Sequence, residues 1–156
     1  MSKVAVITGS AKKRLGFYLA CEAARHGYSI AIHYNTSSAD AESTARELSA
    51  LGAPRVEGYS ADFSRSEDVE RFAEQVLHDF ERVDLLINTA SIWPKLSLLD
   101  TGYPELIKSM DVNLCSVFIL SKLFGLQMTK QTDGGSIVNF GDWSIDRPYL
   151  GYSAYY

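Results

Sequence analysis

The sequence has 156 residues, of which 46% are hydrophobic and 22% charged, a size and composition typical of one soluble globular domain. Its formal net charge of -4 gives no electrostatic reason to expect nucleic acid or a membrane surface as a partner. No apolar run reaches the ~18 residues of a membrane span, and the first strand begins by Val4, which leaves no room for a signal peptide. We therefore expect a cytoplasmic protein.

Short apolar runs alternate with amphipathic segments along the chain. Strands are predicted at residues 3–9, 28–34, 54–62, 83–91 and 134–141. Helices are predicted at residues 15–27, 37–52, 66–80 and 104–130, with capping residues at the start of the second and third. The apolar side of the last helix is predicted to hold Met110, Leu114, Val117, Phe118, Leu120 and Phe124. This alternation predicts a single α/β domain over residues 1–156, a doubly wound parallel sheet with helices on both faces.

The two cysteines, Cys21 and Cys115, lie in apolar helical segments, so we expect both to be reduced and buried. Neither they nor the three histidines show the spacing of metal ligands. No metal site is predicted.

The turn between the first strand and the first helix reads TGSAKKRLG, residues 8–16. Gly9 and Gly16 permit a tight turn and a close approach to a ligand, and the helix that follows offers free N–H groups to a phosphate. Lys12, Lys13 and Arg14 form the densest basic cluster of the chain. A basic loop exposed to solvent is the alternative, but the position favours a phosphate site.

The second strand ends in the neutral residues HYNTSS, 33–38, with no acid before Asp40. A carboxylate here would bind both ribose hydroxyls of NAD and repel a 2′-phosphate. Asn35, Thr36 and Ser37 can instead donate hydrogen bonds, and Arg14 is available to pair with a phosphate. NADP(H) is therefore the predicted cofactor, although Ser37 could also simply cap the following helix.

The turn resembles that of the short-chain dehydrogenase/reductase family, Thr-Gly-x-x-x-Gly-x-Gly. Residues 13–16, Lys-Arg-Leu-Gly, are most similar to pteridine reductases and dihydromonapterin reductases within that family. The resemblance implies a Rossmann-like sheet of strand order 3-2-1-4-5, with the later strands of the family absent from this chain. Between Gly9 and Gly16 the chain has one residue more than the family pattern, so we expect the turn to bulge.

The family also implies roles for residues after the third and fourth strands. Asp62 matches the position that holds the adenine, with capping of the helix at residue 66 as the alternative. The stretch NTAS, 88–91, matches the Asn-Asn-Ala-Gly or Asn-Asn-Ala-Ser of the family, where the cofactor packs on the backbone. The predicted cofactor contacts are Gly9, Lys13, Arg14, Leu15, Gly16, Tyr34, Asn35, Thr36, Ser37, Asp62, Phe63, Asn88, Thr89, Ala90 and Ser91.

Two further residues match positions near the family's nicotinamide site. Trp93 corresponds to an aromatic residue that in pteridine reductases sandwiches the pterin, and Ser91 precedes it on the same predicted substrate wall. Packing of Trp93 under a loop is the alternative. Asn113 matches the asparagine in the middle of the family's long helix, where it holds a water of the proton relay. A hydrogen-bonded core amide would explain Asn113 equally.

The chain ends in GDWSIDRPYLGYSAYY, where Asp142 precedes Tyr155 by thirteen residues. Most family members have a serine thirteen residues before a Tyr-x-x-x-Lys motif, and pteridine reductases have an aspartate there. The resemblance therefore implies that Tyr155 is the proton donor, with Asp142 bound to the substrate or to the tyrosine. Capping of the local turn is the alternative for Asp142. Tyr152 and Tyr156 are poorer candidates, because Asn139 and Trp143 stand thirteen residues before them.

The family's lysine would follow Tyr155 by four residues, at position 159, beyond the last residue of this chain. We expect a fragment of a longer protein, the alternative being a truncated copy without activity. The leading hypothesis is an NADPH-dependent reductase that transfers hydride to a C=N or C=O bond of a small molecule, preferably a pterin. The alternatives are a carbonyl or 3-oxoacyl reductase, or a non-catalytic NADP-binding sensor. The family also implies a homodimer or homotetramer built on the long helix.

Overall fold

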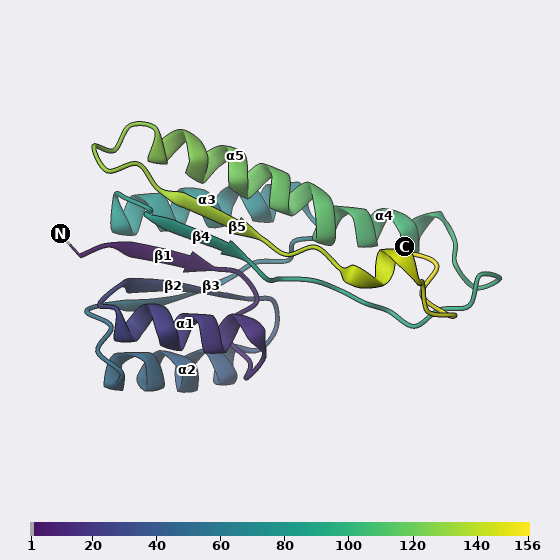
Figure 1. Ribbon diagram of the computed structural model, residues 1–156, viewed down its shortest axis with the longest axis horizontal. Helices are drawn as coiled ribbons and strands as arrows, with labels where there is room; N and C mark the ends of the chain where they lie inside the picture. Colours follow the sequence, from purple (N-terminus) through teal and green to yellow (C-terminus); the bar gives the residue numbers. More distant parts are fainter. Residues whose placement is uncertain (1) are drawn as a thin grey trace.

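The five predicted strands lie side by side in the computed structural model, which describes residues 2–156 (Figure 1). The strands are β1 (Val4–Ile7), β2 (Ser29–Tyr34), β3 (Val56–Ser60), β4 (Leu85–Asn88) and β5 (Ser136–Asn139). They form one parallel sheet in the order β3-β2-β1-β4-β5, which confirms the predicted fold and strand order.

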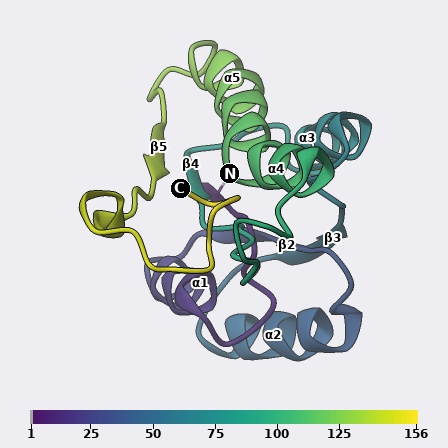
Figure 2. The same cartoon turned by 90° about the vertical axis from the view of Figure 1, so that its right-hand side faces the viewer.

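Helices cover both faces of the sheet, as Figures 1 and 2 show. On one face lie α1 (Leu15–Arg25) and α2 (Ser38–Ala50), and on the other lie α3 (Ser66–Phe80), α4 (Tyr103–Met110) and α5 (Ser116–Met128). Side chains of β1 alternate between the two layers: Ala5 and Ile7 pack toward α1 and α2, whereas Val4 and Val6 pack toward α3 and α5. A strand that is apolar on both faces can therefore only occupy the centre of the sheet.

The predicted helix 104–130 is one continuous rod in which a π-helical segment, Asp111–Cys115, joins α4 to α5. Its predicted apolar side is partly wrong. Leu120 and Phe124 are buried, but Met110, Leu114 and Phe118 are 42%, 58% and 67% exposed. This helix is apolar around most of its circumference, so periodicity alone could not identify the covered face.

The expectation about the cysteines is corrected in part by the structure. Cys21 is buried as predicted, but Cys115 is exposed, because it lies on the uncovered side at the end of the π-helical segment. By length and mean hydropathy alone the rod Tyr103–Met128 could cross a membrane, although Lys108, Asp111 and Lys122 interrupt its apolar runs. Here it packs on α3, β4 and β5 instead.

The predicted helix caps differ from those observed. Ser37 occupies the position before α2 but makes no capping hydrogen bond with its side chain. The residue before α3 is Arg65, whose side chain also makes no capping bond. Acidic residues in the first turn stabilise each helix instead, through their interaction with the positive end of the helix dipole. They are Asp40 in α2, and Glu67 and Asp68 in α3.

Candidate functional site

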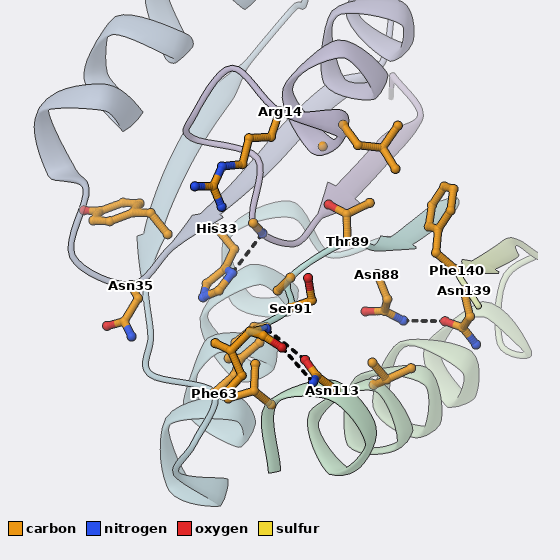
Figure 3. Close-up of a pocket in the computed structure, with 18 of the residues that line it drawn as sticks. Arg14, His33, Asn35, Phe63, Asn88, Thr89, Ser91, Asn113, Asn139 and Phe140 are labelled. Atoms are coloured by element: carbon orange, nitrogen blue, oxygen red, sulfur yellow. Dashed lines mark hydrogen bonds between the residues drawn. The ribbon is translucent and has the colours of Figure 1, made fainter. Parts of the chain in front are cut away.

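A cavity of about 570 Å³ lies beyond the carboxyl ends of the strands. The turn after β1, the ends of β2 to β5, the middle of the long helix and the C-terminal segment all contribute to its wall (Figure 3). The volume is within the range of small-molecule and cofactor sites. Ligands of open parallel sheets bind at this end, where the crossover direction reverses.

Most of the predicted site residues line this cavity. They are Gly9, Arg14, Leu15, Gly16, Tyr34, Asn35, Asp62, Phe63, Asn88, Thr89, Ala90, Ser91, Asn113, Asp142 and Tyr155. Four predicted contacts, Lys13, Thr36, Ser37 and Trp93, are not part of its wall. Residues that the sequence did not single out also line it: His33, Ala61, Ile92, Lys108, Val112, Val117, Asn139, Phe140 and Gly141.

The turn after β1 needs glycine at both of its ends. Gly9 has a φ of +66°, and a Cβ there would stand 2.9 Å from the Ala90 Cα. A Cβ at Gly16 would stand 2.5 Å from the Thr89 Oγ1 and 3.1 Å from the Gly9 carbonyl oxygen. The Thr8 hydroxyl oxygen accepts the N–H groups of Thr89 and Ala90, each at 2.9 Å, which joins the turn to the end of β4. The cavity floor is therefore formed by closely packed backbone.

The basic residues of the turn point in different directions. Arg14 lines the cavity near Asn35, at the end of β2 (Figure 3). Lys13 instead forms an ion pair with Glu47 of α2 at 2.9 Å, and this hydrogen bond and charge raise the pKa of Lys13. An anionic group at this end of the cavity would thus meet the Arg14 guanidinium and the Asn35 amide.

Asn88 provides a polar group in the cavity floor. Its Nδ2 donates to the Asn139 Oδ1 at 2.8 Å, across the β4–β5 pair (Figure 3). Among the residues that the structure describes, its Oδ1 is the buried side-chain oxygen left without a hydrogen-bond partner. Buried polar atoms are normally paired, so this oxygen is suited to accept a hydroxyl from a bound ligand.

Asn113 holds the loop after β4 against the long helix. Its Oδ1 accepts the Ile92 N–H at 2.9 Å, and its Nδ2 donates to the Ile92 carbonyl at 3.0 Å and to the Ser109 hydroxyl at 3.2 Å. The amide is thus fully hydrogen-bonded within the protein while it lines the cavity. Asn113 lies in the π-helical segment, a type of helix irregularity that is frequent at functional sites.

Asp62 does not cap α3, because the residue before that helix is Arg65 and the Asp62 carboxylate accepts hydrogen bonds from Ser64 instead of from the first turn of the helix. Asp62 lines the cavity, and its Oδ1 accepts the backbone N–H of Ser64 at 3.0 Å and the Ser64 hydroxyl at 2.8 Å. These two bonds, the backbone one above all, lower the pKa of Asp62, and they order the turn before α3. The next residue, Phe63, packs face to face on His33.

Asp142 and Tyr155 meet at the opposite end of the cavity. The Tyr155 hydroxyl donates to the Asp142 Oδ2 at 2.7 Å, and the Asp142 Oδ1 accepts the N–H and the hydroxyl of Ser144 at 2.8 and 2.5 Å. The Ser144 bonds, with that of Tyr155, lower the pKa of Asp142. Desolvation and the neighbouring carboxylate raise the pKa of Tyr155 to about 12. At neutral pH the site thus holds a carboxylate and a protonated phenol.

The bonds of Ser144 extend this pair to a second phenol. Because the Ser144 hydroxyl already donates to Asp142, the Tyr156 hydroxyl, 2.7 Å away, donates to Ser144. Asp142 also begins the short 3₁₀ helix Trp143–Asp146, so the capping alternative holds alongside the bond to Tyr155.

Trp93 lies outside the cavity wall and is 54% exposed. It stacks on Tyr152, with ring centroids 4.6 Å apart and planes inclined by 26°, and its ring centroid is 6.2 Å from that of Tyr155. The loop containing Trp93 is joined to the C-terminal segment by the Leu96 N–H, which donates to the Gly151 carbonyl at 2.7 Å. Trp93 therefore stands beside the Asp142–Tyr155 pair rather than above the cavity floor.

The parallel sheet of order β3-β2-β1-β4-β5, with helices on both faces and a cavity beyond the ends of its strands, is a doubly wound α/β fold. The pattern of the short chain dehydrogenase family matches residues 3–156, and the chain belongs to that family.

Relatives of known structure and sequence agree with this membership. The chain is 31% identical over 139 residues to 3-oxoacyl-[acyl-carrier-protein] reductase FabG of Staphylococcus epidermidis, covering 88% of this chain and 55% of that protein. Acetoin dehydrogenase from Enterobacter cloacae superposes with a TM-score of 0.91 at 29% identity, over 99% of this chain and 61% of the other. A metagenomic short-chain oxidoreductase in complex with NADP gives a TM-score of 0.88 at 26% identity, over 98% and 67%. The chain thus spans 55% to 67% of the length of these proteins.

Proposed function

We propose that this chain is the dinucleotide-binding and catalytic part of an NADPH-dependent reductase that acts on a carbonyl group of a small molecule. The observation that carries the proposal is the 2.7 Å hydrogen bond between Tyr155 and Asp142 in the same cavity as the glycine turn. One end of that cavity can bind a dinucleotide, and the other holds a protonated phenol where a reacting group would lie.

The cavity residues suit NADPH. The glycine turn and the start of α1 would bind the pyrophosphate through backbone N–H groups. Arg14 and Asn35 would bind the 2′-phosphate, since β2 ends without a carboxylate to repel it. Asp62 and Phe63 would flank the adenine, and the unpartnered Oδ1 of Asn88 would accept a hydrogen bond near the nicotinamide end. The similar metagenomic oxidoreductase was crystallised with NADP, which supports this choice.

The chain's own residues supply the proton of the reduction. Bound NADPH would provide the hydride for the electrophilic carbon. Tyr155 would then donate its phenolic proton to the oxygen of the substrate as charge develops there. A pKa of about 12 keeps the phenol protonated at neutral pH but makes it a weaker acid than a free tyrosine, so a positive charge close to the hydroxyl would assist the transfer. Asp142, fixed by Ser144, orients the hydroxyl by accepting its hydrogen bond before transfer.

A carbonyl substrate is favoured by the relatives named for oxoacyl and acetoin chemistry. A pterin is the second candidate. It is supported by the carboxylate at position 142, which resembles pteridine reductases, and by the Trp93–Tyr152 stack beside Tyr155, on which a planar ring could pack. The homo-oligomer built on the long helix and the cytoplasmic location stay predictions.

Two measurements on the same preparation test the proposal. Titration with NADPH and NADH, followed by the fluorescence of the reduced nicotinamide, should show tighter binding of NADPH. Loss of NADPH absorbance is then followed with acetoin, a 3-oxoacyl thioester and a dihydropterin. Turnover of a carbonyl compound supports the proposal, and turnover of the dihydropterin alone assigns the pterin candidate instead. Binding without turnover of any of the three favours a sensor, and absence of NADPH binding overturns the assignment altogether.

A further inference from the structure

His33, near the end of β2, is buried in the cavity wall, with 4% of its surface exposed. Both imidazole nitrogens are bonded to the main chain of other segments. Nδ1 accepts the Gly9 N–H at 3.1 Å, and Nε2 lies 3.0 Å from the Ala61 carbonyl oxygen. Since an N–H group only donates and a carbonyl only accepts, the ring is neutral with its proton on Nε2. The imidazole thus bridges the turn after β1 and the end of β3.

The packing of the ring prevents it from turning away from these partners. Phe63 stacks on it with ring centroids 3.8 Å apart and planes inclined by 1°, and Phe72 meets it edge-on at 5.4 Å. The bond from His33 to the turn that leads to Arg14 is drawn in Figure 3. A ring held on one face, at one edge and at both nitrogens has a single orientation.

The bonds of His33 fix the part of the turn that has the least freedom. Gly9 has a positive φ and lies against the Ala90 backbone, and the neighbouring Ser10 N–H donates to the His33 carbonyl at 3.2 Å. His33 therefore holds the turn through its side chain and its main chain. On its other side it holds Ala61, the residue before Asp62 and Phe63.

We propose that His33 is a positioning residue for dinucleotide binding, which fixes the turn that would bind the pyrophosphate by accepting the Gly9 N–H. The inference rests on the proposed NADPH-binding function and adds to it a residue that need not contact the cofactor. A turn already fixed in its binding conformation loses less conformational entropy when the ligand binds. Affinity for NADPH should therefore depend on the Gly9 bond in particular.

Two amide variants separate that bond from the rest. In His33→Asn the side-chain oxygen can take the place of Nδ1 and accept the Gly9 N–H, whereas in His33→Gln the longer amide reaches the position of Nε2 and can donate to Ala61. His33→Phe keeps the stack on Phe63 and loses both bonds. We expect His33→Asn to bind NADPH within about twofold of the wild type, and His33→Gln and His33→Phe roughly tenfold more weakly, the effect of losing one hydrogen bond that orders the site.

Melting temperatures and a control variant distinguish positioning from general stability. Tyr59→Phe removes the partly buried hydrogen bond to Asp79, outside the cavity, and should lower the melting temperature without changing the NADPH affinity. Equal NADPH affinities for His33→Asn and His33→Gln overturn the role of His33 and leave the proposed function standing, even if His33→Phe does not fold. If the NADPH affinity falls together with the melting temperature in every variant, Tyr59→Phe included, the role of His33 is overturned as well. Failure of the wild type to bind NADPH overturns both proposals.

Discussion

The two ends of the cavity are held in place by different means. At the proposed dinucleotide end, β1 is buried along its whole length and β2 over five of its six residues, as their burial patterns show. At the proposed catalytic end, β5 is exposed throughout, and the segment after it presents Trp143 and Leu150 at 72% and 96% exposure. The first end is an extension of the core, and the second is a surface segment.

This difference changes what a substitution can do at each end. The glycine turn is positioned by backbone contacts that tolerate no Cβ, so changes there should weaken cofactor binding. Asp142 and Tyr155 are positioned by side-chain hydrogen bonds, with Asp142 accepting three of them. Changes there should lower turnover and leave cofactor binding and folding nearly unchanged.

The largest effect is expected from Tyr155→Phe. It removes the proposed proton donor and should lower turnover by roughly 10²- to 10⁴-fold, the usual contribution of a positioned acid. The NADPH affinity should stay at the wild-type value. Tyr149→Phe, in the same surface segment but outside the cavity, is the control and should keep full activity. A Tyr155→Phe variant that turns over as fast as the control would exclude Tyr155 as the acid.

The pH dependence of the free energy of unfolding should report on the protonation of His33, at the proposed dinucleotide end of the cavity. Burial lowers the pKa of His33 to about 4, although the charge of Asp62 acts to raise it. In the unfolded chain the imidazole of His33 takes up a proton as the pH falls below the ordinary histidine pKa of ~6.5. In the folded chain it takes up this proton only near pH 4. Stability is thus fully present above pH ~6.5 and falls as the pH drops toward 4, by about 3 kcal/mol in all.

Denaturant unfolding at several pH values measures the slope of the free energy of unfolding against pH. His33→Asn has no imidazole to protonate, so its curve should be flatter over the same interval. Equal slopes for the two proteins would show that His33 does not titrate in this way. Tyr155→Phe, at the other end of the cavity, should keep the wild-type slope.

Gly9→Ala tests the turn itself. The added Cβ would meet the Ala90 Cα at 2.9 Å, and the φ of +66° is strained for alanine. We expect NADPH binding to weaken by roughly tenfold to a hundredfold, as one to three kcal/mol of backbone strain would produce. Gly27→Ala is a useful comparison, because Gly27 also has a positive φ but a Cβ there meets nothing within 4 Å. Gly27→Ala should lower stability and leave the NADPH affinity unchanged.

The sheet and much of the cavity could be predicted because their causes are local in sequence. Alternating strands and helices predict a parallel sheet, and the family resemblance gives its order, which the structure confirms. The family resemblance, and not a local pattern, identified Asp142 and Tyr155 as a pair, and the structure joins them by a hydrogen bond of 2.7 Å. Glycine at the two ends of the turn is required by contacts with β4, and both positions were identified from the sequence.

The remaining residues depend on partners that no local pattern shows. The proposed role of His33 depends on Ala61, 28 residues away and directly after the neighbouring strand β3. Lys13 could have pointed at a phosphate like Arg14, but Glu47 lies within 2.9 Å of it and pairs with it. Trp93 could have covered the cavity, but Tyr152 provides a stacking partner outside it. Of the charged residues predicted at this edge of the sheet, Arg14, Asp62 and Asp142 line the cavity and Lys13 does not.

Ser144→Ala is the smallest and most discriminating change. It removes the hydroxyl bond to the Asp142 Oδ1 but keeps the backbone N–H bond, so the carboxylate should stay near Tyr155 with more freedom. Turnover should fall about fivefold, the effect of one hydrogen bond, and NADPH binding should not change. The Ser144 hydroxyl is the main cause of the lowered pKa of Asp142, so the acid limb of the pH–rate profile should move to higher pH. If turnover falls but the acid limb does not move, Ser144 supports the C-terminal segment without lowering the pKa of Asp142. The two ends of the cavity would then be held in place by more similar means than their hydrogen bonds indicate.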